Sequence, residues 1–250
     1  MDQPTDTKTS FGYRTVTAGQ KPHLVRQVFR SVSPRYDIMN DAMSLGIHRL
    51  WKLALVDWLA PRNGRRFLDL AGGTGDVARS ILERAPEAEI LVVDLTEDML
   101  VEGQRKSMRG PSAGRIGWVA GDAQRLPFAD GSFDCSTISF GLRNFVSIDE
   151  SLAEIRRVLR TGGRLLVLEF SQVPNEALRW LYDRYSFKAI PTMGRVIAND
   201  RDSYQYLVES IRRFPDQESL AALMSDCGYD RVSYRNLSMG IAALHSGWKL

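Results

Sequence analysis

The stretch "LDLAGGTGD", Leu68 to Asp76, is a short hydrophobic run that breaks into three glycines and ends on an acid. The residues that lead into the glycines, from Arg66 to Ala71, have the pattern of a buried strand, and a helix is expected to begin at Asp76. A glycine turn between a buried strand and a helix is typical of α/β proteins that hold a cofactor on that turn. The stretch therefore predicts the fold class and raises the question of which ligand the turn binds.

Taken alone, the glycine turn leaves several ligands open. Gly73, Gly75 and Ala78 satisfy the dinucleotide pattern G-x-G-x-x-G/A, whereas the Gly-Lys-Ser/Thr of a phosphate-binding P-loop is missing. A pyrophosphate at the start of the helix would meet the carboxylate of Asp76 as well as the favourable helix dipole, and Asp69 lies just below the turn. A ligand with a cationic end suits these acids better. A strand, turn and helix with no ligand is the remaining alternative.

The composition is that of a globular domain without a strong charge. The 250 residues are 44% hydrophobic and 25% charged, within reach of one α/β domain with additions. A net charge of +3 is too small to indicate nucleic acid and compatible with contact to an anionic membrane surface. The polar start "MDQPTDTKTS" and apolar runs of at most about eight residues favour a cytoplasmic protein. Cys135 and Cys227 are expected as small buried side chains, and no metal-ligand spacing is apparent.

Strands and helices are expected to alternate through the centre of the chain. The predicted strands are "RRFLDLA", "AEILVVDL", "RIGWVAG", "SFDCSTISF" and "GGRLLVLEF", and the predicted helices are residues 76–84, 96–108 and 148–159. This alternation predicts a mostly parallel sheet with helices on both faces. Ligands of such sheets bind at the carboxyl ends of the strands.

The flanking segments complete a single domain over residues 22–250. Residues 1–21 are expected to form a flexible arm, 22–60 a helical cap, 64–170 the cofactor-binding core, and 174–214 a helical, aromatic-rich segment. Residues 215–250 are expected to form a helix and two strands. Because "SMG", Ser238 to Gly240, is short enough for a hairpin, the sheet is predicted to end with an antiparallel strand.

Two further acids follow the second and third predicted strands. Asp94 ends the second strand 19 residues after Gly75, where a carboxylate can accept both hydroxyls of a ribose. Asp122, beside the small Ala123, follows the third strand and could accept a hydrogen bond from an adenine amino group. These positions fit a dinucleotide and a simple adenosine equally well. The Tyr-x-x-x-Lys pair or catalytic histidine of many nicotinamide enzymes is not apparent.

At this point the sequence resembles a known family. "LDLAGGTGD", "GDAQRLPF" and "GGRLLVLEF" resemble the class I S-adenosylmethionine-dependent methyltransferases. "VFRSVSPRYDIMNDAMSLGIHRLWK", "FDCSTISFGLRN" and "GIAALHSGWK" resemble one branch, the ubiquinone/menaquinone biosynthesis C-methyltransferases, and matching segments run from Phe11 to the C-terminus. The chain departs from that pattern at "SPRYD" and at Thr161, neither of which is a ligand position. The resemblance implies a Rossmann-like, mostly parallel seven-stranded sheet with an antiparallel C-terminal strand.

The resemblance also implies the cofactor. S-adenosylmethionine carries a sulfonium and an ammonium and no phosphate, so that the acids Asp69 and Asp76 become favourable. Carried over by motif, Thr74 contacts the methionine portion, Asp94 the ribose, Asp122 and Ala123 the adenine, and Ser139 lies near the reacting methyl. Gly73 and Gly75 let the backbone approach the cofactor closely.

The implied reaction is methyl transfer to a ring carbon of a polyprenylated quinol, either demethylmenaquinol or 2-polyprenyl-6-methoxy-1,4-benzoquinol or both. A quinol is far more nucleophilic at carbon as a phenolate, so a group near the ring must handle a hydroxyl proton. The candidates are His48, Asp37, Tyr36 and Arg143. His48 has the ordinary pKa of a base, whereas Arg143 could stabilise the phenolate electrostatically, which is the preferred interpretation.

The substrate end is expected to be apolar. The segment 174–214, with Met39, Met43, Leu45 and Trp51, would cap the ring and its tail, and a set of basic residues could face lipid head groups: Arg179, Arg184, Lys188 and Arg195. The expected partners are the quinol, the inner face of a membrane, and a quinone-biosynthesis complex or a second copy of the chain, but not nucleic acid. Nucleic-acid amino methyltransferases carry Asp/Asn-Pro-Pro-aromatic where this chain has "SFGLRN". A non-catalytic quinone-binding protein of this fold is the other alternative.

Overall fold

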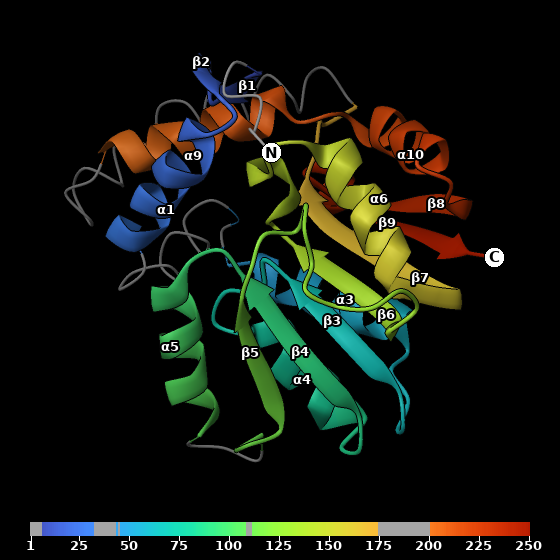
Figure 1. The fold of residues 1–250 in the computed structure, drawn as a ribbon. Coiled ribbons are helices and arrows are strands. Elements are labelled where there is room, and N and C mark those ends of the chain that lie inside the picture. The colour runs from blue at the N-terminus through green and yellow to red at the C-terminus, as the bar shows by residue number, and fades with distance from the viewer. Residues whose placement is uncertain (1–6, 33–43, 45, 109–111, 175–200) are drawn as a thin grey trace.

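A seven-stranded sheet forms the centre of the molecule (Figure 1). The computed structural model describes residues 7–32, 44, 46–108, 112–174 and 201–250. The strands lie in the order β5-β4-β3-β6-β7-β9-β8: β5 Ile116–Ala120, β4 Glu89–Asp94, β3 Arg66–Leu70, β6 Phe133–Ser139, β7 Leu159–Phe170, β9 Ala242–Lys249 and β8 Asp230–Leu237. β9 runs antiparallel to both of its neighbours, while the pairs from β5 to β7 are parallel. The predicted sheet and its antiparallel C-terminal strand are confirmed.

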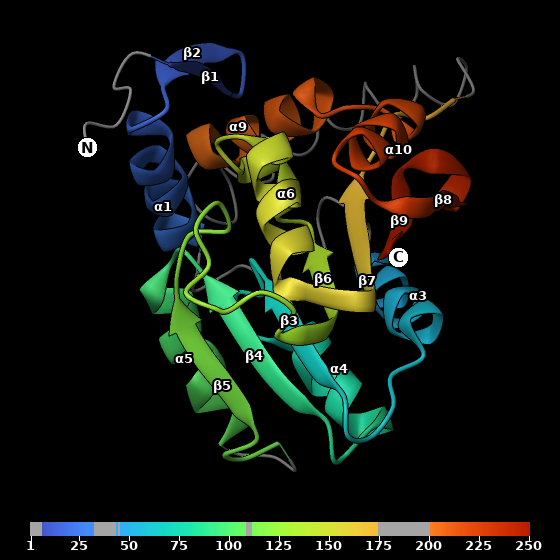
Figure 2. The same ribbon diagram turned by 45° about the vertical axis from the view of Figure 1, so that its right-hand side comes forward.

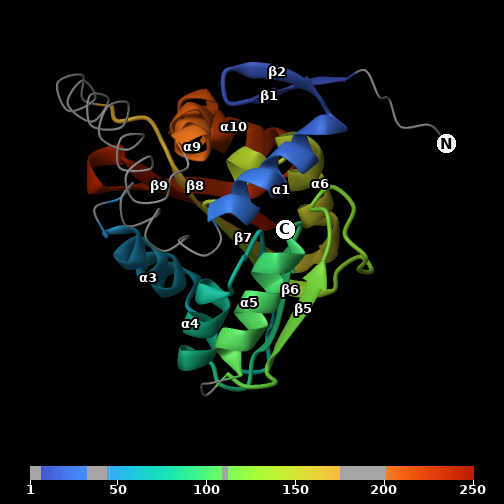
Figure 3. The ribbon, with the colours of Figure 1, turned by 90° about the vertical axis from the view of Figure 1, so that its left-hand side faces the viewer.

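Helices cover both faces of the sheet, as Figure 3 shows edge-on. α3 His48–Leu59, α4 Asp76–Arg84 and α5 Glu97–Ser107 lie on one face, and α6 Ile148–Val158 and α10 Gln217–Asp226 on the other. Successive residues of a strand therefore enter different cores: Phe67 packs in the cluster with α3 and α4, and Leu68 in the cluster with α6 and α10. Because both faces are covered, the central strands read as near-continuous apolar runs.

Above the carboxyl ends of the strands lies a further layer, built from the N-terminal segment and α9 (Figure 2). It consists of the strands β1 Lys8–Phe11 and β2 Arg14–Thr17, which pair antiparallel, and the helices α1 Gln20–Val32 and α9 Arg201–Arg213. Phe11 stacks on Tyr206 of α9 with ring centroids 4.1 Å apart. The predicted flexible arm is therefore wrong for residues 8–17. The short, polar strands carry only Phe11 and Val16 as buried apolar residues, too few for a recognisable pattern.

Two side-chain caps fix helix starts on the α6 and α10 face. The Ser147 hydroxyl accepts a hydrogen bond from the Glu150 N–H, and the Asp216 carboxylate accepts one from the Ser219 N–H. Cys135 and Cys227 are both free thiols. In the described part of the chain, none of the helices combines the length and apolar character that a membrane crossing requires.

Candidate functional site

A cavity opens where β3, β4 and β6 end, beneath α1. Its described lining consists of Pro22, Val25, Phe29, Leu70, Ala71, Gly73, Val93, Asp94, Leu95, Thr96, Met99, Gly121, Asp122, Ala123, Phe140, Gly141, Asn144, Phe145 and Val146. α1 supplies an apolar wall and the strand ends supply a polar one. Two acids and no lysine, arginine or histidine stand among these residues. A phosphate-bearing ligand would meet only negative charge here, whereas a cationic ligand would be stabilised.

The glycine turn forms one edge of the cavity. Ala71, Gly73 and Gly75 all have left-handed backbone conformations, with φ of 49°, 54° and 76°. A Cβ on Gly75 would lie 2.6 Å from the ring of Trp118, so a side chain does not fit there. Gly73 lines the cavity directly, and the turn thereby brings backbone rather than side chain to the ligand.

Asp94 links the glycine turn to the start of α5. The N–H of Gly73 donates to its Oδ2 at 2.9 Å, and the N–H of Thr96 donates to its Oδ1 at 2.8 Å. Burial raises the pKa of this carboxyl, and the two backbone hydrogen bonds counteract part of that rise. Asp94 also lines the cavity, where its carboxylate is in reach of a ligand hydroxyl.

Asp69 lies behind the turn, with only 1% of its surface exposed. Its Oδ1 accepts a 2.6 Å hydrogen bond from Thr137, while Oδ2 has no hydrogen-bond partner among the described residues. Oδ2 points at the turn, because a Cβ on Gly72 would lie 2.7 Å from it. Burial raises the pKa of Asp69 to about 7, although the Thr137 hydrogen bond and the charge of Lys52 lower it.

The expectation for Asp76 is wrong, because the protein itself neutralises this acid. Lys52 Nζ lies 3.1 Å from one carboxylate oxygen, and the Arg79 guanidinium contacts the other. Burial alone would raise the pKa of Asp76, but the charges of Lys52 and Arg79 outweigh it and hold the pKa at about 2. Asp76 therefore fixes the start of α4 and offers no free charge to a ligand.

The loop after β5 places Asp122 and Ala123 at the opposite edge of the cavity. Asp122 is exposed, and its Oδ1 accepts a 2.9 Å hydrogen bond from the N–H of Gln124. The two residues predicted to contact adenine thus line the same cavity as Asp94 and Gly73.

Two other residues predicted to contact the cofactor, Thr74 and Ser139, lie behind the cavity wall. The Thr74 hydroxyl is buried and lies 3.4 Å from Asp76, and the Ser139 hydroxyl is buried with no partner in the part of the chain that the structure describes. Neither is among the described lining residues; Phe140 and Gly141, which follow Ser139, are. Phe140 has φ of 59°, and this left-handed turn carries the chain from β6 into the cavity wall.

Arg143 forms a buried ion pair instead of facing the cavity. It belongs to the 3-10 turn Leu142–Asn144, and its Nη1 lies 2.7 Å from Glu169 Oε1 and donates to the Phe140 carbonyl at 2.6 Å. The Arg143 and Glu169 side chains are each only 2% exposed. The geometry therefore does not support direct contact of Arg143 with a phenolate. Arg143 instead fixes the turn from Phe140 to Asn144.

The other residues expected at the catalytic and substrate end are described only in part. His48 is buried at the start of α3, with Nδ1 3.0 Å from the Ser44 hydroxyl. Trp51 donates to Ser238 and packs against Phe140 and Phe170. The remaining candidates lie outside the described residues: Tyr36, Asp37, Met39, Met43, Leu45, Arg179, Arg184, Lys188 and Arg195.

Sequence reasoning missed Glu169 and Asn144. Glu169 is a single acid within the apolar run "LLVLEF", the same signal that marked Asp69 in "FLDLA". Asn144 lines the cavity and accepts a 2.9 Å hydrogen bond from the Tyr206 hydroxyl, a contact between segments 62 residues apart. The first could have been found from the sequence, and the second could not.

Comparison with known proteins identifies close relatives. The profile of the ubiE/COQ5 methyltransferase family matches residues 14–249. A protein of Paracoccus denitrificans named ubiquinone/menaquinone biosynthesis C-methyltransferase UbiE is 62% identical over 249 residues, covering 100% of this chain and 99% of that protein. A mitochondrial 2-methoxy-6-polyprenyl-1,4-benzoquinol methylase of Dictyostelium discoideum is 46% identical over 272 residues, covering 97% of this chain and 87% of that protein.

Solved structures share the fold at low sequence identity. A SAM-dependent methyltransferase of Thermotoga maritima has a TM-score of 0.64 and 19% identity, covering 90% of this chain and 99% of that one. One of Aquifex aeolicus has a TM-score of 0.59 and 13% identity, covering 80% and 89%. At such identities the likeness establishes the architecture alone.

Proposed function

The chain belongs to the ubiE/COQ5 methyltransferase family, and from that membership we propose that it methylates a ring carbon of a polyprenylated quinol. It is an S-adenosylmethionine-dependent methyltransferase of ubiquinone/menaquinone biosynthesis. The observation that carries the proposal is the cavity lining: acids at the strand ends, no basic side chain among the described lining residues, and an apolar wall from α1. That lining suits a cationic cofactor beside an apolar ring.

The described residues fit S-adenosylmethionine at three places. Asp94 would accept the ribose hydroxyls, Asp122 with Ala123 would hold the adenine, and the Gly73 backbone would lie against the methionine portion. Asp69 would act from behind the turn, because its unpartnered Oδ2 is an orphaned buried acceptor on the side of the turn. Thr74, Gly75 and Ser139 would shape this wall without reaching the cavity.

The chemistry leaves the chain with two tasks, alignment and exclusion of water. The cofactor supplies, when bound, a methyl group already activated on a sulfonium. Phe140, Gly141 and Phe145 line the cavity on the side of α1 and would hold the ring against it. Holding two reactants in a near-attack geometry contributes roughly 7–11 kcal/mol to a bimolecular step.

The hydroxyl proton of the quinol must leave for the ring carbon to become a strong nucleophile. We assign Arg143 a positioning role, because it holds the Phe140–Asn144 turn through the Phe140 carbonyl and Glu169. His48, oriented by Ser44, is the candidate base among the described residues. If His48→Ala abolishes turnover while Arg143→Lys keeps it near wild type, the histidine takes the proton. The reverse result would exclude His48 as the base and support the positioning role of Arg143.

A polyprenyl tail places the substrate in a bilayer, so we further propose peripheral contact with the inner face of the membrane. Of the segments expected to cover the tail, 22–60 and 174–214, the structure describes the helices α1, α3 and α9. Sedimentation with anionic vesicles tests this contact. Binding only together with another quinone-biosynthesis protein, or as a dimer, would assign the membrane contact to that assembly.

The deciding experiment is transfer of a labelled methyl group from S-adenosylmethionine to a lipid extract. The purified chain is incubated with either demethylmenaquinol or 2-polyprenyl-6-methoxy-1,4-benzoquinol, and the product is identified by mass. Label on the ring of one quinol or both supports the proposal and identifies the acceptor. Tight cofactor binding without label in either quinol would indicate a non-catalytic quinone-binding protein, and tight NADH binding would contradict the cofactor.

A further inference from the structure

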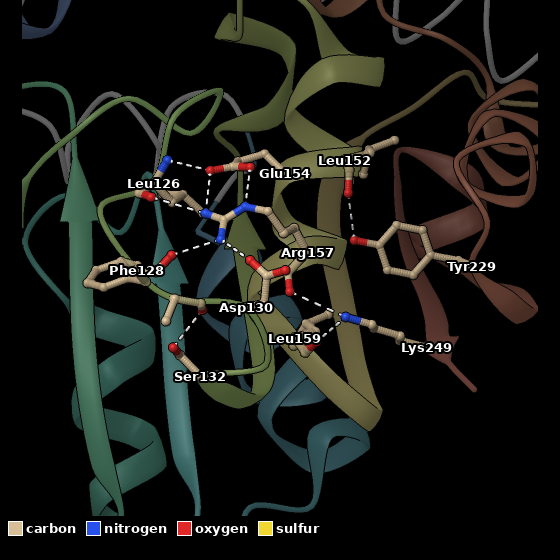
Figure 4. A network of polar contacts seen from close by, with 11 residues as sticks. Leu126, Phe128, Asp130, Ser132, Leu152, Glu154, Arg157, Leu159, Tyr229 and Lys249 are labelled. Carbon is tan, nitrogen blue, oxygen red and sulfur yellow. Dashed lines mark hydrogen bonds and ion pairs between the residues drawn. The ribbon is translucent and has the colours of Figure 1, made fainter.

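We propose that Arg157 is a positioning residue for the adenine end of the site: it fixes the loop of residues 121–132, which carries Asp122 and Ala123. The inference rests on the proposed function, because it takes the adenine contacts of these two residues as given. It concerns a residue on the outer side of the loop, away from the cavity lining. Its evidence is the network of contacts shown in Figure 4.

The loop needs support because its backbone is almost free of regular structure. Between the end of β5 at Ala120 and the start of β6 at Phe133, the described chain contains no helix or strand, only the isolated bridge between Asp122 and Arg125. Backbone carbonyls and N–H groups in such a segment must find partners elsewhere. Some of the partners lie within the loop or on neighbouring strands, and several come from the helix α6.

Arg157, near the end of α6, bonds two carbonyls and one carboxylate of the loop. Its Nη1 donates to the Phe128 carbonyl at 2.9 Å and contacts the Asp130 carboxylate at 2.6 Å, and its Nη2 donates to the Leu126 carbonyl at 3.2 Å. Both Nε and Nη2 also contact the Glu154 carboxylate at 2.8 Å. Figure 4 shows the guanidinium in the middle of the loop, with these groups arranged around it.

The same face of α6 extends the support toward Asp122. Glu150, Glu154 and Arg157 are four and three residues apart and therefore share one helix face. Glu154 Oε1 accepts from the Leu126 N–H at 2.7 Å, and Glu150 accepts from the Gln124 amide at 2.5 Å. The Gln124 N–H in turn donates to Asp122. Arg157 and Glu154 thus hold Leu126, and Glu150 on the same helix face holds Gln124, which contacts the predicted adenine residue.

The helix that carries Arg157 is itself held in place. Lys249 Nζ, at the end of β9, donates to the carbonyls of Leu159 at 2.6 Å and Arg157 at 3.3 Å, and the Tyr229 hydroxyl donates to the Leu152 carbonyl at 2.9 Å (Figure 4). The loop is thus fixed to the C-terminal part of the sheet through α6. A displacement of the loop would move Asp122 relative to Asp94, and with it the adenine relative to the ribose.

Only an arginine can make this set of contacts. Its planar fork presents five N–H donors from three nitrogens, here used on two carboxylates and two carbonyls, whereas a lysine presents a single nitrogen. We therefore expect Arg157→Lys to behave like Arg157→Gln. The matched control is Arg156→Gln, because Arg156 stands on the same helix and donates to the Gly228 carbonyl outside the loop.

The test compares two ligands that differ only at the N1–C6 edge of the purine, where the amino group of S-adenosylhomocysteine is replaced by a carbonyl and N1 gains a proton in S-inosylhomocysteine. Calorimetry of the wild type should show a preference for the adenine form. Arg157→Gln should reduce the ratio of the two dissociation constants at least about fivefold and raise KM for S-adenosylmethionine, with kcat at saturation within about twofold of wild type. Arg156→Gln should leave the ratio unchanged.

A general loss of stability would weaken both ligands equally and leave their ratio intact, so an Arg157→Gln variant that binds with the wild-type ratio overturns the proposal. Should Arg157→Gln fail to fold, Arg157→Lys keeps the charge but not the planar fork, and a wild-type ratio in that variant overturns the proposal as well. Equal binding of both ligands by the wild type would refute the adenine assignment of Asp122 itself, and the role of Arg157 with it.

Discussion

The two halves of the sheet's carboxyl edge treat buried acids in opposite ways. At the ends of β3 and β4, Asp69 is buried and Asp94 is half-buried; both have raised pKa values, and neither forms an ion pair with a basic side chain in the described chain. At the ends of β6 and β7, burial also raises the pKa of Glu169, but Arg143 lies 2.7 Å away and its charge counteracts that rise. The first half therefore holds acids without an ion-pair partner, and in the second the acid is paired with a cation.

This difference separates the two ligands of the site. A buried carboxylate without a cation is unfavourable, and its pKa rises because the charged form is disfavoured. A cationic ligand would remove that penalty, so on the proposed function we assign the β3–β4 half to the cofactor. We assign the β6–β7 half, where Arg143 pairs with Glu169 beside Phe140 and Phe170, to shape and apolar contact.

Breaking the neutral half should have the largest effect. Arg143→Met leaves Glu169 buried without its partner, which costs about 3–5 kcal/mol of stability when one member of a buried pair is removed. Replacing both residues, as Arg143→Met with Glu169→Leu, should restore much of the loss because no charge is left uncompensated. Denaturant unfolding measures both. A single variant as stable as the wild type would show that the pair is not the neutralising device described here.

Removing an acid from the cofactor half should instead affect binding. We expect Asp94→Ala to weaken S-adenosylmethionine binding by about 2–3 kcal/mol, because two charge-assisted ribose hydrogen bonds are lost. Asp98→Ala is the matched control, since Asp98 lies in the first turn of α5 and pairs with Arg30 at the surface. Calorimetry is the measurement. Unchanged affinity in the Asp94 variant would remove this residue from the site.

Local patterns explain how much of the fold the sequence could predict. Apolar runs predicted the five central strands, the short link "SMG" predicted the two strands that follow, and helix α4 begins and ends where expected, at Asp76 and Arg84. Asp94 and Asp122 reach the cavity because they end neighbouring strands of a parallel sheet. Positions on strand ends are fixed by the fold, and so they could be predicted.

Pairing between distant residues could not be predicted. Nothing in "FGLRN" indicates that Arg143 meets Glu169, 26 residues later, rather than a substrate. Of the two partners of Asp76, Lys52 lies 24 residues earlier on α3 and could not be predicted, whereas Arg79 lies three residues later on α4 and could have been found from helix spacing. The contacts of Arg143 and Lys52 are long-range, and periodicity does not encode them.

Asp69 and Asp76 should respond in opposite directions when their charge is removed. The folded-state pKa of Asp69 is about 7 against 3.8, so its stabilising contribution is present at low pH and is lost as the pH rises through that interval. Asp69→Asn should therefore stabilise the ligand-free protein at pH 8 by about 1–3 kcal/mol, part of the gain being offset by an amide without a partner.

The control for that prediction is Asp76→Asn. The pKa of Asp76 is held at about 2, so its contribution is present above 3.8 and lost as the pH falls; the variant should be less stable than the wild type at pH 8. Thermal unfolding at pH 5 and pH 8 measures both variants. If Asp69→Asn also loses stability at pH 8, the negative charge of Asp69 is stabilised in the folded protein, and the β3–β4 half does not hold an unpaired acid.

The most direct test of the uncompensated acids is the pH dependence of S-adenosylmethionine affinity in the wild type and in Asp69→Asn, by calorimetry between pH 6 and pH 8. Because a cationic ligand binds the ionised form, wild-type affinity should rise about tenfold over this range as Asp69 loses its proton near pH 7. The ligand's own amine, with a pKa of about 7.7–8.0, contributes equally to both proteins and cancels in their ratio. The account predicts that Asp69→Asn binds more weakly at pH 8 and loses the rise. The same rise in both proteins would contradict it, because Asp69 would then not contribute to holding the cationic end.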